Sequence, residues 1–210
     1  MKIGIIGTGN VGSGLGDIWA KQGHQILFSF SKDRDHLREV AEAAGANASV
    51  GTPQEAVAFG EVVVLAVPWG AVDAALEQAG SLNGKILFTT VNALKPDFSG
   101  LEVGTTTSAG EEIARRAPGA IVVESMPVNA EILHSSSRQF GTVSPTVFYV
   151  GDDANAKLLV AKLLEETGME PVDAGPLTNA RLIEPAGFLV AQLGYALGLG
   201  PNVALKLLRR

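Results

Sequence analysis

Apolar runs alternate along the chain with segments of helical spacing. Five early runs are continuously apolar and end at Gly, Pro or polar residues, as strands buried on both faces do: 3–7, 25–30, 61–67, 85–90 and 120–125. Between them lie five segments that we predict as helices: 10–22, 34–44, 53–59, 71–79 and 108–116. This strand–helix alternation predicts a parallel sheet covered by helices on both faces.

The last third of the chain continues the pattern in shorter form. A strand is predicted over 146–151, a helix over 153–167, a short strand over 170–175, and a long apolar helix over most of 177–199. We therefore predict an α/β fold of the Rossmann type. It would be a doubly wound, mainly parallel sheet with a small C-terminal α/β extension that ends in the long helix. Residues 1–123 would form the dinucleotide-binding core, and residues 124–210 would pack on it in one compact unit.

Composition narrows the function classes. The chain has 210 residues, of which 46% are apolar, so it can bury a substantial core. Its net charge of −6 and the lack of a basic run argue against nucleic-acid binding. The longest nearly apolar segment, 187–200, is too short to span a membrane. With no cysteine and no signal peptide before residue 2, a soluble cytoplasmic protein is expected.

The segment "GTGNVG" (7–12) has the G-x-G-x-x-G spacing of dinucleotide-binding loops. It follows the first predicted strand and opens the first predicted helix, which is the context that the motif requires. Gly7 would permit the tight turn, Gly9 would let the backbone approach a pyrophosphate, and Gly12 would allow close helix–strand packing. The helix N-terminus favours an anion. A glycine-rich turn without a ligand is the plainer alternative, but this context predicts nucleotide binding.

The segment "FSFSKDR" (28–34) lies where such proteins choose between NAD and NADP. An acid that binds the ribose 2′-hydroxyl of NAD is expected about 20 residues after the glycine motif. The count leads to Phe30, Ser31 and Lys32, and their hydroxyl and ammonium donors favour a 2′-phosphate. NADP is therefore predicted. Asp33 keeps NAD open, because a shift of one or two residues would make it the ribose acid, and an ordinary exposed loop is the other alternative.

Three motifs together resemble one known family over nearly the whole chain. "IGIIGTGNVG" (3–12), "LAVPWGAV" (65–72) and "DAGPLTNARLIEP" (173–185) are similar to those of the coenzyme F420-dependent NADP oxidoreductases, which are related to the reductase domain of membrane metalloreductases. The resemblance implies a Rossmann fold, a homodimer, and hydride transfer between NADP and a deazaflavin. Some relatives act on flavin or ferric iron. NADPH is the expected cofactor, with F420 or flavin as the co-substrate.

The resemblance also implies a set of cofactor contacts. Members that bind NADP have Ser-Arg where this chain has Phe30 and Ser31, so Lys32 or Arg34 would replace the arginine. Asn92 would lie near the nicotinamide. The complete expected cofactor set is Gly7, Thr8, Gly9, Asn10, Val11, Gly12, Phe30, Ser31, Lys32, Arg34, Val67, Pro68, Ala71 and Asn92.

The acceptor is expected against the segment after the strand at 120–125, which reads "SMPVNAEILH". In the family, the deazaflavin pocket lies around this segment. Met126, Pro127 and Val128 would form an apolar floor, and Asn129 would offer a polar group, as is common in small-molecule pockets. Pro127 stands where relatives commonly have Asn or His, so the resemblance does not identify the acceptor.

No residue set for nucleophilic or acid–base catalysis stands out, and no catalytic residue is assigned. Hydride transfer between two rings needs mainly positioning, because the cofactors hold the reactive atoms. A non-catalytic NADP-binding redox sensor and a reductase of ferric chelates remain alternatives. A conventional dehydrogenase would require a general acid at its carbonyl.

The remaining candidates have structural interpretations. His24 would sit at the end of the first helix, and His36 would face solvent. The three histidines are too scattered for a metal site. Arg181 and Glu184 would pair along the last helix. The apolar surface of that helix is expected to form the seam of a homodimer.

Overall fold

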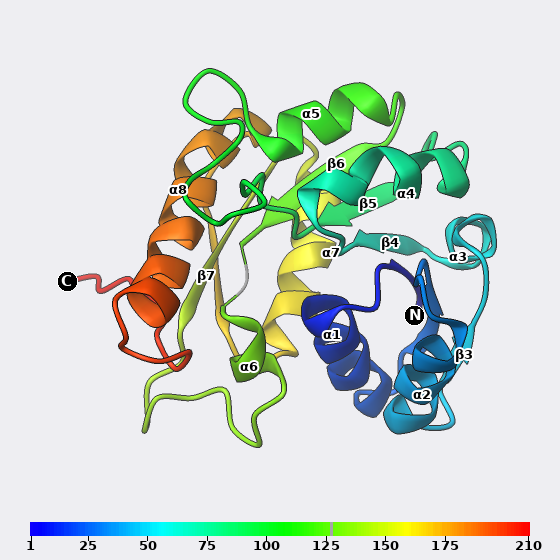
Figure 1. Ribbon diagram of the computed structural model, residues 1–210, viewed down its shortest axis with the longest axis horizontal. Coiled ribbons are helices and arrows are strands. Elements are labelled where there is room, and N and C mark those ends of the chain that lie inside the picture. Colours follow the sequence, from blue (N-terminus) through cyan, green and yellow to red (C-terminus); the bar gives the residue numbers. More distant parts are fainter. Residues whose placement is uncertain (127) are drawn as a thin grey trace.

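The computed structural model describes residues 1–126 and 128–210, which build one eight-stranded sheet with helices on both faces (Figure 1). The strands lie in the order β3-β2-β1-β4-β5-β6-β7-β8. Neighbours from β3 to β6 are parallel, β7 is antiparallel to β6, and β8 is parallel to β7. The strands are β1 Lys2–Ile6, β2 Gln25–Ser29, β3 Ala48–Val50, β4 Val62–Leu65, β5 Ile86–Thr89, β6 Ile121–Ser125, β7 Thr146–Gly151 and β8 Glu170–Asp173. The predicted Rossmann-type α/β class is confirmed.

The helices form two layers, and each layer closes its own core. One core packs α1, α2, α6 and α7 on the sheet, and the other packs α3, α4, α5 and α8 on the opposite face (Figure 1). The helices are α1 Asn10–Lys21, α2 Arg34–Ala44, α3 Pro53–Phe59, α4 Val72–Ala79, α5 Ala109–Arg116, α6 Ala130–Leu133, α7 Ala154–Glu165 and α8 Ala180–Ala191.

Local sequence explains where these elements begin and end. β4 reads VVVL and is buried at every position, as a central parallel strand should be. α3 begins at Pro53 with a capping box in which Thr52 and Glu55 satisfy each other's backbone N–H groups. Between the two parts of the chain, the indole of Trp19 in α1 donates to the carbonyl of Leu163 in α7 over 2.8 Å.

Most of 177–199 is helical, but the one long apolar helix expected there is not supported. The structure has a 3-10 turn at Leu177–Asn179, then α8, which ends at Ala191, and then a π-helical turn at Gln192–Ala196. Pro185 lies inside α8, and Gly198 and Gly200, both with positive φ, end the helical path. Over the described residues, no helix is both long and apolar enough to cross a bilayer.

Two short elements were not expected from the sequence. β3 is a three-residue edge strand, and α6 is a single helical turn after β6. Both are too short for periodicity to reveal them.

Candidate functional site

The glycine loop between β1 and α1 needs glycine at two positions for packing. Gly7 has φ +109, and a Cβ there would overlap the carbonyl oxygen of Ala66. A Cβ on Gly12 would overlap the carbonyl oxygen of Gly7. The tight turn and the close approach of α1 to the loop therefore both depend on the missing side chains.

Gly9 differs from these two glycines. A Cβ there would meet no atom within 4 Å, so this part of the loop faces open space. Gly9 is also the N-cap of α1, and no side chain caps the helix. The first backbone N–H groups of the helix, at Asn10 and Val11, are thus available to a ligand. An uncapped helix N-terminus with an open glycine beside it fits a pyrophosphate.

The neighbouring residues fix the loop in place. Thr8 is buried, and Val11 packs partly into the core. The N–H of Gly7 donates to the carbonyl of Ser29 at the end of β2 over 3.0 Å. The hydroxyl of Ser29 in turn donates to the carbonyl of Ile5 over 2.9 Å. The glycine loop is therefore hydrogen-bonded to the end of β2, at the start of the 28–34 segment.

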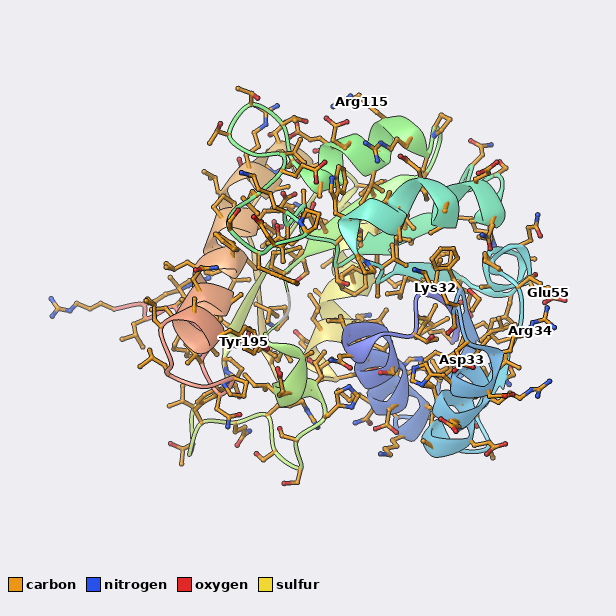
Figure 2. All side chains as sticks on the ribbon, in the orientation of Figure 1. Lys32, Asp33, Arg34, Glu55, Arg115 and Tyr195 are labelled. Atoms are coloured by element: carbon orange, nitrogen blue, oxygen red, sulfur yellow. The ribbon has the colours of Figure 1, made fainter. Side chains whose placement is uncertain are left out.

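The segment after β2 carries the expected cofactor-selecting residues. Phe30 has φ +59, a left-handed conformation that is rare for a bulky residue and often marks a functional turn. The Ser31 hydroxyl accepts from the N–H of Asp33 over 3.2 Å. Lys32 and Arg34 are exposed, and Figure 2 shows both close to Asp33 beside α2.

Asp33 is occupied by the helix that follows it. As the N-cap of α2, its Oδ1 accepts from the N–H of Asp35 over 2.8 Å and from that of His36 over 3.2 Å. The carboxylate that left NAD open is thereby committed to capping α2.

His36 lies closer to the site than expected. Its side chain is exposed, but Nε2 also contacts the carbonyl oxygen of Thr8 in the glycine loop over 3.1 Å. The expectation that it simply faces solvent is therefore incomplete. Its place at the first turn of α2 puts its imidazole beside the glycine loop.

The residues that follow β4 lie beside the glycine loop. Val67 is buried and lies directly against Gly7, where a Cβ would come within 2.8 Å of Val67 Cγ1. Pro68 is exposed, and Ala71 ends the short 3-10 turn Trp69–Ala71. The guanidinium of Arg116 stacks on the Trp69 ring at 4.7 Å from its centroid. This contact supports a structural role for the tryptophan.

Asn92 follows β5 and reaches across to the last helix. Its Nδ2 donates to the carbonyl of Glu184 over 3.0 Å, and among the described residues its buried Oδ1 has no donor. The expected residues from Gly7 to Asn92 thus come from loops after β1, β2, β4 and β5. These loops share the carboxyl edge of the parallel sheet, where open α/β folds bind ligands.

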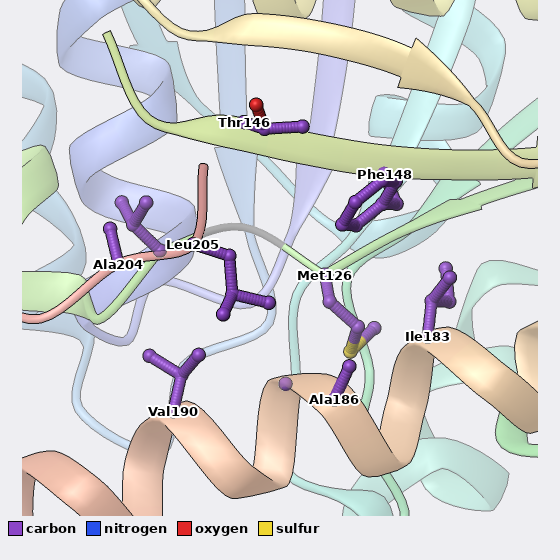
Figure 3. A pocket seen from close by; sticks show the side chains of 10 residues that line it. Met126, Thr146, Phe148, Ile183, Ala186, Val190, Ala204 and Leu205 are labelled. Atoms are coloured by element: carbon purple, nitrogen blue, oxygen red, sulfur yellow. The ribbon is translucent and has the colours of Figure 1, made fainter. Parts of the chain in front are cut away.

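Part of the expected acceptor segment lines a small cavity (Figure 3). Met126 packs over Gly187 of α8, where a Cβ would lie 3.2 Å from Met126 Cβ. Val128 is buried, and Asn129 Nδ2 donates to the carbonyl of Pro201 over 2.9 Å. Pro127 lies outside the described residues. Ala204 and Leu205 of the C-terminal segment also line this cavity, and its volume of about 30 Å³ is too small for a ring, which would have to lie outside it.

Comparison with known proteins identifies the family of this chain. Residues 2–93 match the family model described as NADP oxidoreductase, coenzyme F420-dependent. The structure of a candidate F420-dependent NADP reductase from Arthrobacter sp. FB24 is similar, with 32% identity over 100% of both chains and a TM-score of 0.87. The chain belongs to the coenzyme F420-dependent NADP oxidoreductase family. The family resemblance drawn from the three motifs is confirmed, and the protein is an NADP-dependent oxidoreductase.

Two further solved structures are similar to this chain. A hypothetical protein from Sinorhizobium meliloti is 26% identical over 100% of this chain and 96% of its own, with a TM-score of 0.77. A reductive aminase from Aspergillus terreus in complex with NADPH4, cyclohexanone and allyl amine is 20% identical and has a TM-score of 0.66. The match covers 94% of this chain but 62% of the aminase, and it shows a shared fold.

Sequence reasoning gave Arg181 and Glu184 the wrong partners and did not predict the contact that His134 makes. Arg181 pairs with Glu111 of α5 over 2.6 and 2.8 Å, and Glu184 is buried, so the expected pairing of these two along α8 is wrong. His134 Nε2 contacts the carbonyl oxygen of Asn10 over 2.8 Å, which joins the acceptor segment to the glycine loop. His24 contacts Glu166 over 2.7 Å, in agreement with its structural assignment.

Proposed function

We propose that this protein transfers hydride from NADPH to a planar, flavin-like acceptor, either deazaflavin F420 or a flavin. NADPH supplies a hydride, and the acceptor takes that hydride together with one proton from solvent. The observation that carries the proposal is the open Gly9 loop joined to a segment whose only acid, Asp33, caps α2.

The chain's own groups account for cofactor binding. Backbone N–H groups at the start of α1 would hold the pyrophosphate between Thr8 and Gly12. Ser31, Lys32 and Arg34 would donate to the 2′-phosphate, and a carboxylate facing that phosphate would repel it. Phe30, directly after β2, has a left-handed backbone conformation that turns the chain before these three residues. Ser31, Lys32 and Arg34 would thus each offer the phosphate a hydrogen-bond donor.

The residues toward the other end would position rings and exclude water. Val67, Pro68 and Ala71 form the edge along which the dinucleotide would lie, and Asn92 would reach the nicotinamide end. The acceptor would pack over Met126, Val128 and Asn129, with Pro127 part of the same segment. Protein groups here need only hold two rings at about 3–3.5 Å, because the reactive atoms belong to the cofactors.

The direct test offers several acceptors in parallel to the protein with NADPH. NADPH oxidation is followed by absorbance with F420, FMN, FAD and ferric chelates. We expect fast turnover with one of the ring acceptors and little with the chelates. Tight NADPH binding without turnover of any acceptor would instead support a redox-sensing module. Preferred turnover of the chelates would make the protein a ferric reductase.

Met126→Ala is expected to raise the KM for the ring acceptor about tenfold and to leave the Kd of NADPH unchanged. The half-buried thioether would give its packing surface to the acceptor, and losing it removes about 1–2 kcal/mol. Steady-state kinetics and a fluorescence titration separate the two quantities. Met169→Ala is the matched control, because Met169 lies in the core on the other face of the sheet. An unchanged KM in Met126→Ala would place the acceptor elsewhere.

We further propose that two copies of the chain associate through α8 and the turn after it. The outer surface here exposes large apolar side chains: Leu182, Leu189, Tyr195, Leu197 and Leu199. Large apolar side chains that gather on the outer surface of one element are typical of an interface between proteins. We place the dimer in the cytoplasm, because a chain without cysteine fits a reducing compartment.

Leu182→Glu combined with Leu189→Glu should yield a monomer in sedimentation equilibrium, because each new charge would be buried in the seam. Leu158→Glu, an equally exposed leucine on α7, is the control and should remain dimeric. A parent protein that sediments as a monomer would contradict the dimer.

A further inference from the structure

Two glutamates from distant parts of the chain meet in the core between β6, α5 and α8. Glu124 of β6 and Glu184 of α8 are each 0% exposed, and both carboxyl groups lie against Gly110 at the start of α5. The N–H of Gly110 at the start of α5 donates to Glu184 Oε1 over 3.2 Å. A Cβ on Gly110 would overlap Glu124 Oε2, so α5 approaches the pair closely.

The pair lacks donors if both carboxyls are ionised. Among the described residues, both oxygens of Glu124 and Oε2 of Glu184 have no donor. Two buried carboxylates in contact would repel each other and leave these acceptors unpaired, at a cost of several kcal/mol. One proton between them removes one charge and supplies the missing donor.

The surroundings favour retention of that proton. Burial, and then the neighbouring Glu184 carboxylate, raise the pKa of Glu124 well above its usual range. Burial raises the pKa of Glu184 to about 7. On α5, Glu111 adds a further negative charge, and Arg181 of α8 pairs with that residue. The paired positions on β5 and β7 are Thr89 and Val150, which are uncharged.

The pair is joined to both ends of the proposed site. The carbonyl of Glu184 accepts from Asn92 Nδ2, so α8 holds the residue expected at the nicotinamide end. Met126 lies two residues beyond Glu124 on the same chain, and it packs on Gly187, one helical turn beyond Glu184. Contact between the two carboxyls therefore stabilises the packing of α8 under the acceptor floor.

We propose that Glu124 and Glu184 share one proton at neutral pH and act as positioning residues. The shared proton holds α8 on β6, and it thereby keeps Asn92 and Met126 in place for hydride transfer. Loss of the proton at alkaline pH would place two negative charges in contact and loosen α8. The link to turnover rests on the proposed function, but the docking of α8 does not.

Hydrogen exchange tests the docking without any acceptor. Protection of the α8 amides in the parent protein, corrected for intrinsic exchange rates, should fall by up to about tenfold per pH unit as the pH rises. The decline should begin at about pH 5, where the carboxyls of an undocked α8 ionise, and end at the raised pKa of the docked pair. In Glu124→Gln the amide donates permanently to Glu184, so protection should stay constant. Glu184→Gln also keeps one donor in the contact and should behave alike. Glu77→Gln, an exposed acid on α4, is the control and should keep the parent's decline.

Two more readouts separate the parts of the proposal. A protonated-carboxyl infrared band should be present at neutral pH in the parent and absent in Glu124→Gln. With the acceptor found to work best, kcat/KM should decline at alkaline pH in the parent and Glu77→Gln, and not in Glu124→Gln. If no acceptor is reduced, the proposed function fails, while exchange and infrared results still decide the shared proton. A Glu124→Gln protein whose α8 protection falls with rising pH as the parent's does would overturn the proposal.

Discussion

Gly9→Val is expected to abolish NADPH binding while the protein folds as before. A valine side chain at this position would stand in the space where the pyrophosphate must approach the first N–H groups of α1. The backbone tolerates the change, because Gly9 has φ −69 and ψ −176, an extended conformation in which valine is favourable. Its Cβ would meet no atom within 4 Å. Stability should therefore be nearly unchanged.

A fluorescence titration with NADPH, together with thermal unfolding, measures both expectations. Binding should weaken by at least roughly 100-fold, which corresponds to about 3 kcal/mol. Gly100→Val is the matched control, because its Cβ would also reach open space and would come no nearer than 3.9 Å to Lys95. Gly12→Val should instead destabilise the fold, since its Cβ would overlap the loop backbone. A Gly9→Val protein with the parent's NADPH affinity would place the nucleotide elsewhere.

The glycine loop shows what the sequence can predict. Spacing and context assigned different roles to Gly7, Gly9 and Gly12, and the structure separates them in the same way. The two glycines assigned to turn and packing have no room for a Cβ, and the one assigned to ligand approach faces open space. The sequence predicts the roles of these glycines because each role depends on residues that are close together in the chain.

The capping role of Asp33 was also within reach of the sequence. An acid directly before a helix predicted to begin at residue 34 is the usual signature of an N-cap. This capping role weakens the argument for NAD. The start of α2 at residue 34 is predicted correctly, but Asp33, the side chain that caps it, is interpreted as a possible ribose acid.

The buried acid pair could not be predicted from the sequence. Glu124 stands in an otherwise apolar strand and Glu184 in an amphipathic helix, and periodicity assigns neither a partner. Their contact depends on how β6 pairs with its neighbours and where α8 packs. The antiparallel pairing of β6 with β7 was missed for a related reason, because a buried strand has the same apolar pattern in either direction.

The contacts of the two histidines at the glycine loop also join distant parts of the chain, so the sequence does not predict them. His36 contacts the carbonyl oxygen of Thr8, from which it is separated by 28 positions in the sequence. His134 contacts the carbonyl oxygen of Asn10, at a separation of 124 positions. Their local sequences resemble those of ordinary surface residues. Only the packing of α2 and α6 around α1 brings them to the site.

Ser31→Asp should shift the cofactor preference from NADPH toward NADH. The new carboxylate would face the 2′-phosphate, where the parent offers only donors, and it would suit the 2′-hydroxyl of NADH. The local turn should persist, since an aspartate can accept from the N–H of Asp33 as the Ser31 hydroxyl does. NADPH binding should weaken by about 10- to 100-fold, or roughly 1.5–3 kcal/mol, and NADH binding should be equal or tighter.

Ser31→Asn is the control that makes this result specific. Asparagine keeps the turn and nearly the same shape without the charge, so both dinucleotides should bind it with similar small losses. Parallel titrations of the three proteins with NADPH and NADH give the comparison. If Asp and Asn weaken NADPH equally, the charge is irrelevant and Ser31 does not face the phosphate. Lys32 and Arg34 would then be the residues to replace, because both are exposed beside the capped start of α2 and are free to turn toward the cofactor.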